Sequence, residues 1–155
     1  MFKKATEYTV KTGKGYSTIS KLNAIDKAMV DASIGRFNLI KVSSVLPVGI
    51  KKVQKIYGDI GELKPAVISK VTAKNKELVA GLGWGTRKDG SGYVMEHSSV
   101  DDKVEVDSYK KELEDKLHEM EKCRNIEFEN TEYAYEKVDA KKDEYGCAFA
   151  ALVYL

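Results

Sequence analysis

Two segments of the chain carry apolar residues at the three- to four-residue spacing of an amphipathic helix. The first segment follows Ser20, and serine caps helix N-termini through its hydroxyl group. Gly35 lies near the other end of the segment, and glycine readily adopts the left-handed conformation that often ends a helix. The pattern therefore predicts a short helix with a buried face that comprises Leu22, Ile25, Met29 and Ala32.

The second helical segment begins at Asp107 or Ser108, either of which can cap it, and runs to about Lys122. Glutamate and lysine residues fill the positions between the apolar ones and predict a side that faces solvent. The face that we expect to be buried comprises Tyr109, Leu113, Leu117 and Met120.

Six other segments have the composition or the alternation that is typical of β-strands: 37–42, 66–72, 78–84, 92–98, 125–138 and 146–155. An Asp-Gly pair at 89–90 predicts a hairpin between the third and fourth of these segments. The last segment is continuously apolar, as in a central strand that is covered on both faces. Residues 48–64 predict an exposed connector. This mixture of elements is compatible with an α+β sandwich but does not select one architecture.

Length and composition limit the class of protein. A chain of 155 residues, 43% of them hydrophobic, suits one domain, 1–155, with a sizeable core. The formal net charge is only +2, which disfavours nucleic acid and anionic membranes as partners. Two cysteines, Cys123 and Cys147, and two histidines, His97 and His118, show no metal-binding spacing, so we expect no metal cofactor. A disulfide between the cysteines stays open.

The sequence also indicates a location. Residues 1–7 lack the apolar core of a signal peptide. No stretch reaches the roughly 18 apolar residues that are needed to cross a bilayer. We therefore expect a soluble, cytoplasmic protein with no membrane partner.

The serine pair Ser43-Ser44 is the candidate for unusual chemistry. It follows the predicted strand 37–42, and Pro47 comes soon after it. A hydroxyl beside a strained peptide bond can cut its own chain, because it can attack the carbonyl carbon before it. Adjacent serines are common, so the pair acquires weight only from its surroundings.

Those surroundings resemble the archaeal-type pyruvoyl-dependent arginine decarboxylases. The likeness extends from about residue 20 to the end of the chain, and its most specific part is the block around the serines. The matching blocks are NAID at 23–26, ASIGRFNLIKVSSVLP at 32–47, the small-residue strand at 80–85, YVMEH at 93–97 and GCAFAA at 146–151.

The resemblance implies a fold and a covalent cofactor. Members of the family fold as a four-layer α/β/β/α sandwich of the pyruvoyl-dependent histidine/arginine decarboxylase type. They are proenzymes that split between the paired serines, here into a β chain, 1–43, and an α chain, 44–155. They assemble as homotrimers with active sites between subunits. Ser44 becomes the pyruvoyl group, which forms a Schiff base with arginine while carbon dioxide leaves and agmatine forms.

The resemblance also implies roles for single residues in the site. Asn38 stabilises the oxyanion of the cleavage step, and Glu96 returns a proton to the α-carbon. Asp26 binds the substrate guanidinium group, because a carboxylate matches its fork geometry. Further residues that line the pocket are Leu22, Gly35 and Phe37.

Several other interpretations of the substrate, the activity and the single residues remain open. The substrate can be another amino acid, such as histidine or lysine, or the chain can be an uncleaved homologue that acts as a regulatory or structural subunit. Asn38 can satisfy a backbone group, Asp26 can be an exposed helix carboxylate, and Glu96 can face water. His97 receives no role, because alternation places it on the opposite strand face from Glu96.

Overall fold

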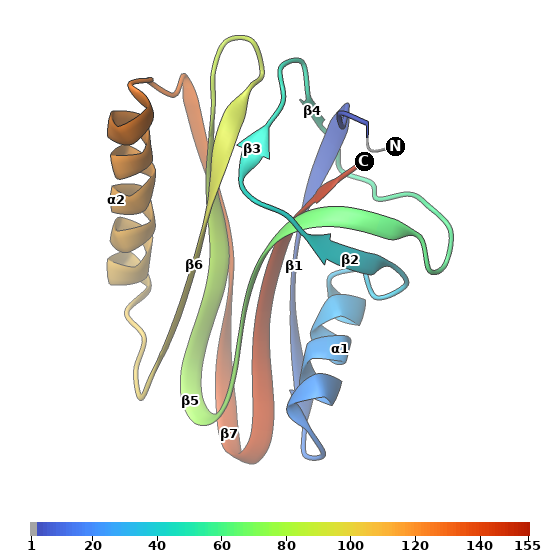
Figure 1. The fold of residues 1–155 in the computed structure, drawn as a ribbon. Helices are drawn as coiled ribbons and strands as arrows, with labels where there is room; N and C mark the ends of the chain where they lie inside the picture. Colours follow the sequence, from blue (N-terminus) through green and yellow to red (C-terminus); the bar gives the residue numbers. More distant parts are fainter. Residues whose placement is uncertain (1–2) are drawn as a thin grey trace.

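The computed structural model describes residues 3–155, which form one mixed sheet of seven strands and two helices (Figure 1). In space the main strands follow the order β3-β6-β5-β7-β1-β4, and β2 pairs with β5 away from this path. The elements are β1 (Glu7–Ser17), α1 (Lys21–Asp31), β2 (Asn38–Lys41), β3 (Val45–Leu46), β4 (Lys51–Lys52), β5 (Leu63–Thr86), β6 (Gly92–Asp101), α2 (Val106–Arg124) and β7 (Asn130–Tyr154).

Two long strands, β5 and β7, are the frame of the sheet. They pair antiparallel over most of their length, with a shift in register between Lys74 and Lys76. At this shift Asn75 has a φ of 51°, and Asp143 opposite it has a φ of 60°. A bulge of this kind bends a strand without ending its ladder. The predicted separate strands 66–72 and 78–84 therefore belong to the two halves of one strand, β5. The predicted strands 125–138 and 146–155 join in β7, which begins only at Asn130, because Asn125 caps the end of α2.

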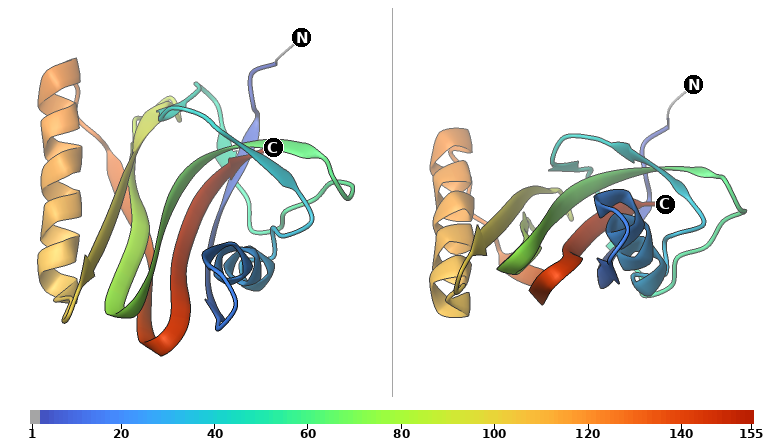
Figure 2. Two further views of the ribbon diagram at one scale, coloured as in Figure 1. Left: turned by 60° about the horizontal axis from the view of Figure 1, so that its bottom comes forward. Right: turned by 90° about the horizontal axis from the view of Figure 1, so that it is seen from below.

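The bends curl the sheet, and each helix covers a different part of its outer surface (Figures 1 and 2). Helix α1 packs beside β1, and α2 packs beside β6. Inside the curl, Val67 from the first half of β5 shares a core cluster with Leu82 and Trp84 from its second half. The two halves of the sheet therefore bury their inner faces together, which accounts for the α+β class.

Helix α1 begins as predicted, because the Ser20 hydroxyl accepts a hydrogen bond from the backbone N–H of Asn23 at 3.1 Å. Its buried face agrees with the prediction in part, since Ala32 is buried and Ile25 and Met29 pack against the same core cluster. Leu22 is 77% exposed, and the fully buried residues of the helix are Ala24 and Ala28. These small side chains let the helix approach Gly13 and Gly15 of β1, where an added Cβ would meet the helix backbone. The helix also ends before the predicted stop, since the left-handed residue is Ser33 and not Gly35.

Helix α2 buries Tyr109, Leu113 and Leu117, as the periodicity predicted. Its first residue is Val106 and its N-cap is Glu105, so the predicted caps Asp107 and Ser108 lie inside the helix. Asp107 in the first turn still stabilises the helix through its dipole. Within residues 3–155, no helix has the length and apolar composition that a membrane span requires.

The predicted hairpin is confirmed. Strands β5 and β6 pair antiparallel from Glu77 and Asp101 up to Thr86 and Gly92, and Gly90 in the turn has a φ of 84°. Strand β1 was not predicted, because its sequence contains few large apolar residues. It pairs antiparallel with the apolar carboxyl-terminal half of β7.

Candidate functional site

The serine pair lies in the short link between β2 and β3. Ser43 is exposed and Ser44 is partly buried. Directly after the pair the chain joins β6, where the backbone N–H of Val94 donates a hydrogen bond to the carbonyl oxygen of Ser44 at 2.9 Å. The hydroxyl of Tyr154 donates to the carbonyl oxygen of Val45, also at 2.9 Å. The segment that follows the Ser43–Ser44 bond is therefore held at two successive carbonyl groups.

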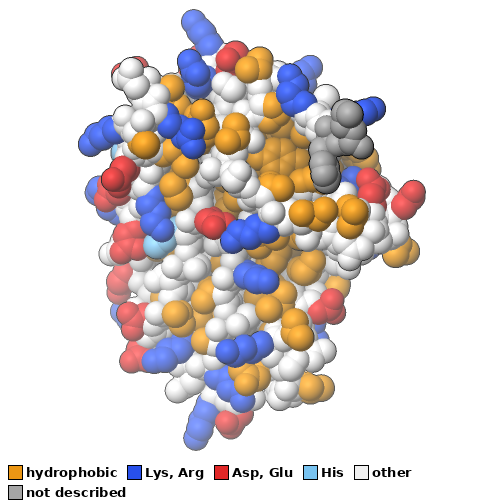
Figure 3. Space-filling view, viewed as in Figure 1, with side chains coloured by type: hydrophobic (Ala, Val, Ile, Leu, Met, Phe, Trp, Pro, Cys, Tyr) orange, Lys and Arg blue, Asp and Glu red, His pale blue; other side chains and the backbone are white. Residues whose placement is uncertain are grey.

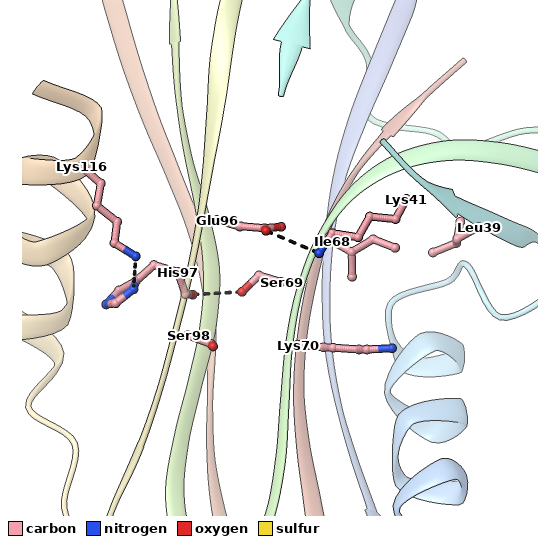
Figure 4. Close-up of a pocket in the computed structure, with 9 residues that line it drawn as sticks. All are labelled: Leu39, Lys41, Ile68, Ser69, Lys70, Glu96, His97, Ser98 and Lys116. Carbon is pink, nitrogen blue, oxygen red and sulfur yellow. Dashed lines mark hydrogen bonds and ion pairs between the residues drawn. The ribbon is translucent and has the colours of Figure 1, made fainter. Parts of the chain in front are cut away.

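Glu96 lies two residues beyond Val94 in β6. Side chains alternate along a strand, so Glu96 shares a face with Val94, which belongs to the inner core cluster. Two residues span about 7 Å of strand, so the register places Glu96 near the serine link. Its side chain extends across the curl toward Lys41 of β2, with 3.5 Å between Nζ and Oε1 (Figure 4). Its other oxygen, Oε2, is shielded from solvent and has no hydrogen-bond partner within the described chain.

An open pocket of about 720 Å³ surrounds this ion pair (Figure 4). A volume of this size suits a small-molecule ligand such as an amino acid. The serine pair does not line this pocket, and Ser43 instead borders a smaller hollow of about 300 Å³. The residues that line the larger pocket are Leu39, Lys41, Ile68, Ser69, Lys70, Glu96, His97, Ser98 and Lys116.

His97 points away from Glu96, as alternation predicted. Its Nε2 contacts a carboxylate oxygen of Glu112 at 2.7 Å, and its Nδ1 contacts the Lys116 ammonium at 2.8 Å. The ring also stacks on Tyr109 with 5.0 Å between centroids. These contacts bind the imidazole to α2 and leave it outside the chemistry around Glu96.

Asn38 stands at the start of β2, and the serine pair follows the end of that strand. Its side-chain N–H donates to the carbonyl oxygen of Gly61 at 2.8 Å. The length of β2 thus separates the Asn38 amide from the Ser43 carbonyl. In the structure the Asn38 side chain thus satisfies a backbone carbonyl group. Its role in stabilising the oxyanion stays a prediction.

The residues predicted to bind the substrate side chain lie apart from the pocket around Glu96. Asp26 and Leu22 are exposed on α1, and Gly35 is exposed in the loop after it. Phe37 is only 5% exposed, and its ring lies under the Arg36 guanidinium at 4.8 Å and near the Lys64 ammonium at 5.5 Å. One chain therefore does not bring this group of residues to the serine pair.

Two polar residues of the pocket were not predicted from the sequence. Lys41 lies two residues before Ser43 in the block that carries the resemblance, so its position was a usable signal. Ser69 gave no such signal. Its hydroxyl donates to the carbonyl oxygen of His97 at 2.9 Å and accepts from the N–H of Gly81 at 3.2 Å, which joins the two halves of the curled sheet.

Among residues 3–155, no group of three or more His, Cys, Asp or Glu side chains is placed to hold a metal ion. Cys123 is exposed and Cys147 is buried, and both thiols are free, so the disulfide that the sequence left open is not formed. Burial raises the pKa of the Cys147 thiol to about 11.

Comparison with known proteins identifies the family. The sequence profile described as "Pyruvoyl-dependent arginine decarboxylase (PvlArgDC)" matches residues 7–155. A "Pyruvoyl-dependent arginine decarboxylase" of Methanococcus aeolicus is 31% identical, with 97% of this chain and 90% of the relative covered. Proteins of the same name from Methanothermobacter thermautotrophicus and Methanopyrus kandleri are 31% and 27% identical over 88% and 96% of this chain, with 88% and 95% of the relatives covered.

The chain therefore belongs to the pyruvoyl-dependent arginine decarboxylase family. This confirms the resemblance drawn from the serine block and extends it toward the amino terminus, from about residue 20 to residue 7. The family name implies an enzyme with a covalent pyruvoyl group.

Proposed function

We propose that this chain is a self-processing enzyme that converts L-arginine to agmatine and carbon dioxide. The observation that carries the proposal is the register of β3 on β6. That register fixes the Ser44 carbonyl on the backbone of Val94 and places Glu96 two residues further along the same face. This arrangement supports a proton donor on β6 close to the proposed site of cofactor formation in the link before β3.

Self-processing starts at the Ser44 hydroxyl, which attacks the carbonyl carbon of Ser43. The C–N bond between the serines breaks and an ester to the Ser44 oxygen replaces it. Elimination then leaves a carboxylate on Ser43 and dehydroalanine at residue 44, and water converts this to the pyruvoyl group with release of ammonia. The products are the chains 1–43 and 44–155.

The ends of the serine link are held by different parts of the sheet. Before it, the N–H of Val42 donates to the carbonyl oxygen of Ala66 in β5 at 3.0 Å, and after it Ser44 is bound by Val94 in β6. This anchoring supports the proposal, because both new ends stay in place when the bond between them breaks. Asn38 remains our proposed donor to the oxyanion, a role for which its amide must leave the carbonyl of Gly61.

The residues present fit the pyruvoyl group that the family name implies. Its ketone would condense with the substrate amine and draw electrons away as carbon dioxide leaves. The Val94 N–H would hold the adjoining carbonyl in place, as it holds that of Ser44 here. Glu96 would supply the proton that replaces the lost carboxylate on the α-carbon.

The finer architecture and the assembly belong to the same proposal. The curled sheet with one helix on each outer surface supports the four-layer α/β/β/α sandwich (Figure 2). Leu22 at 77% and Val30 at 63% exposure flank Asp26 on the outer face of α1, and Figure 3 shows exposed apolar side chains over this region. For Asp26 to reach the substrate, the pocket of a neighbouring copy must lie beside this face. We therefore propose a cytoplasmic homotrimer with its sites between subunits.

Product analysis tests the reaction directly. The purified chain is incubated with equal concentrations of arginine, histidine and lysine, and amines and carbon dioxide are measured. The proposal expects agmatine as the main product, and borohydride added during turnover should attach arginine-derived label to the chain 44–155. Preferential formation of histamine or cadaverine would overturn the choice of substrate. Absence of carbon dioxide from all three would favour a non-catalytic homologue.

A further inference from the structure

Lys41 is the one cation that forms an ion pair with Glu96 among residues 3–155. It is the last residue of β2, and its side chain crosses the gap between β2 and β6 (Figure 4). Both side chains are more than one third exposed, so the pair contributes little to the stability of the fold. A stabilising role therefore does not explain the arrangement well, and a role in the pocket is the better account.

The two oxygens of the Glu96 carboxyl have different environments. Oε1 lies 3.5 Å from the Lys41 ammonium, while Oε2 is shielded from solvent without a hydrogen-bond partner. A buried carboxylate oxygen without a donor is unfavourable. A proton on Oε2, or a donor from a bound molecule, would relieve it. The asymmetry therefore marks Oε2 as the oxygen that exchanges a proton.

The other charged groups of the pocket do not substitute for Lys41. Lys116 contacts His97 on the opposite face of β6, and His97 in turn contacts Glu112. Lys70 extends toward α1 and away from Glu96 (Figure 4). The orientation of the Glu96 carboxyl thus depends on a contact with one residue.

We propose that Lys41 is a positioning residue for Glu96: its ammonium fixes Oε1 so that Oε2 delivers the proton to the α-carbon of the substrate. This inference rests on the proposed function and deepens it. It also links the two products of self-processing, because Lys41 belongs to 1–43 and Glu96 to 44–155. The end of the small chain then acts on the proton donor of the large one.

Substitution of Lys41 tests this role against a matched control. Lys41→Met removes the ammonium and keeps the length of the side chain. Because a misplaced group slows chemistry more than binding, we expect unchanged self-cleavage, a fall in kcat of about tenfold and a change in KM of less than about threefold. Lys41→Arg should restore most of kcat. Lys14→Met, which breaks another lysine–glutamate pair, with Glu136 at 3.6 Å, should leave kcat unchanged.

Two further measurements separate positioning from a general effect of charge. In a Glu96→Gln background, Lys41→Met should lower kcat by less than about twofold, because Lys41 then has no carboxylate to orient. The carboxyl ¹³C signal of Glu96, identified by its loss in Glu96→Gln, should shift in Lys41→Met and not in Lys14→Met.

A wild-type kcat in Lys41→Met, an equal loss in Lys14→Met or an unmoved Glu96 signal would overturn the role of Lys41. Failure of the wild-type chain to decarboxylate arginine would instead overturn the proposed function. In that case the ¹³C signal still decides whether Lys41 orients Glu96.

Discussion

At the scale of single residues, we propose separate tasks for Ser44 and Glu96, which the pairing of β3 with β6 places near each other. In this proposal the Ser44 hydroxyl acts before the enzyme is mature, and the Glu96 carboxyl acts only in turnover. The Val94 N–H binds the Ser44 carbonyl at 2.9 Å and lies two residues before Glu96 in β6. Substitutions should therefore separate self-processing from catalysis.

Glu96→Gln should leave self-cleavage intact and lower kcat for arginine by about 100-fold or more. The amide keeps the size of the side chain but cannot donate a carboxylic proton, and general acid catalysis contributes roughly 10²- to 10⁴-fold. Cleavage is measured by denaturing electrophoresis, and turnover by release of carbon dioxide. Glu129→Gln, at an exposed carboxylate, is the control and should behave as wild type. Normal turnover in Glu96→Gln would show that another group supplies the proton.

At the scale of elements, the approach of α1 to β1 depends on two glycines. A Cβ on Gly15 would lie 2.2 Å from the carbonyl oxygen of Ala24 in the helix backbone. Gly15→Ala should therefore lower the free energy of unfolding by roughly 1–3 kcal/mol, because the helix must move outward. Urea denaturation measures this.

Gly49→Ala gives a contrasting control for this prediction. Nothing lies within 4 Å of an added Cβ at Gly49, and its φ of 81° adds only backbone strain. Its cost should be about 1–2 kcal/mol. A Gly15→Ala protein as stable as wild type would mean that α1 packs less closely than described.

Local patterns predicted some elements and failed for others, and the difference has a physical cause. The Ser20 cap and the face of α2 were predictable, because capping and helical periodicity involve neighbouring residues. The joining of separately predicted strands into the long strands β5 and β7 was not predictable. The bends at Asn75 and Asp143 are set by pairing between distant segments.

The same contrast applies to the candidate site. Alternation correctly separated His97 from Glu96, since it acts within one strand. Burial of Phe37 depends on Lys64 of β5 and on the core cluster that it shares with Phe149 of β7, and no local pattern signals these distant contacts.

At the scale of the whole molecule, buried acids make stability depend on alkaline pH. Burial raises the pKa of Cys147 from 9.0 to about 11 and that of Tyr154 from 10.0 to about 12. The unfolded chain therefore loses these protons at lower pH than the folded chain. The contribution of these two groups to stability should be fully present below about pH 9 and be lost as the pH rises through 11 toward 12.

Urea titrations at pH 8, 10 and 11 would measure this fall. Cys147→Ala should show a shallower decline between pH 9 and 11, because the buried thiol that titrates in this range is gone. Identical free energies of unfolding at all three pH values would contradict the assigned shifts.

The proposed assembly makes its own prediction for mixed subunits. Asp26 and Glu96 do not meet within one chain, so a complete site needs both residues from different copies. Asp26→Asn and Glu96→Gln proteins should each be weakly active, and refolding them together should restore roughly a quarter of wild-type activity, since some mixed sites carry both wild-type residues. Activity no higher than that of the separate variants would place both residues within one subunit.

Intact-mass spectrometry of the mature protein measures whether Ser44 becomes a ketone when the chain breaks before it. We expect two chains, 1–43 and 44–155, with the mass of the second showing a pyruvoyl group in place of serine. Ser44→Ala should remain whole, while the control Ser108→Ala should split normally. A single wild-type chain of 17.3 kDa that retains its serine hydroxyl at position 44 would show that no pyruvoyl group forms.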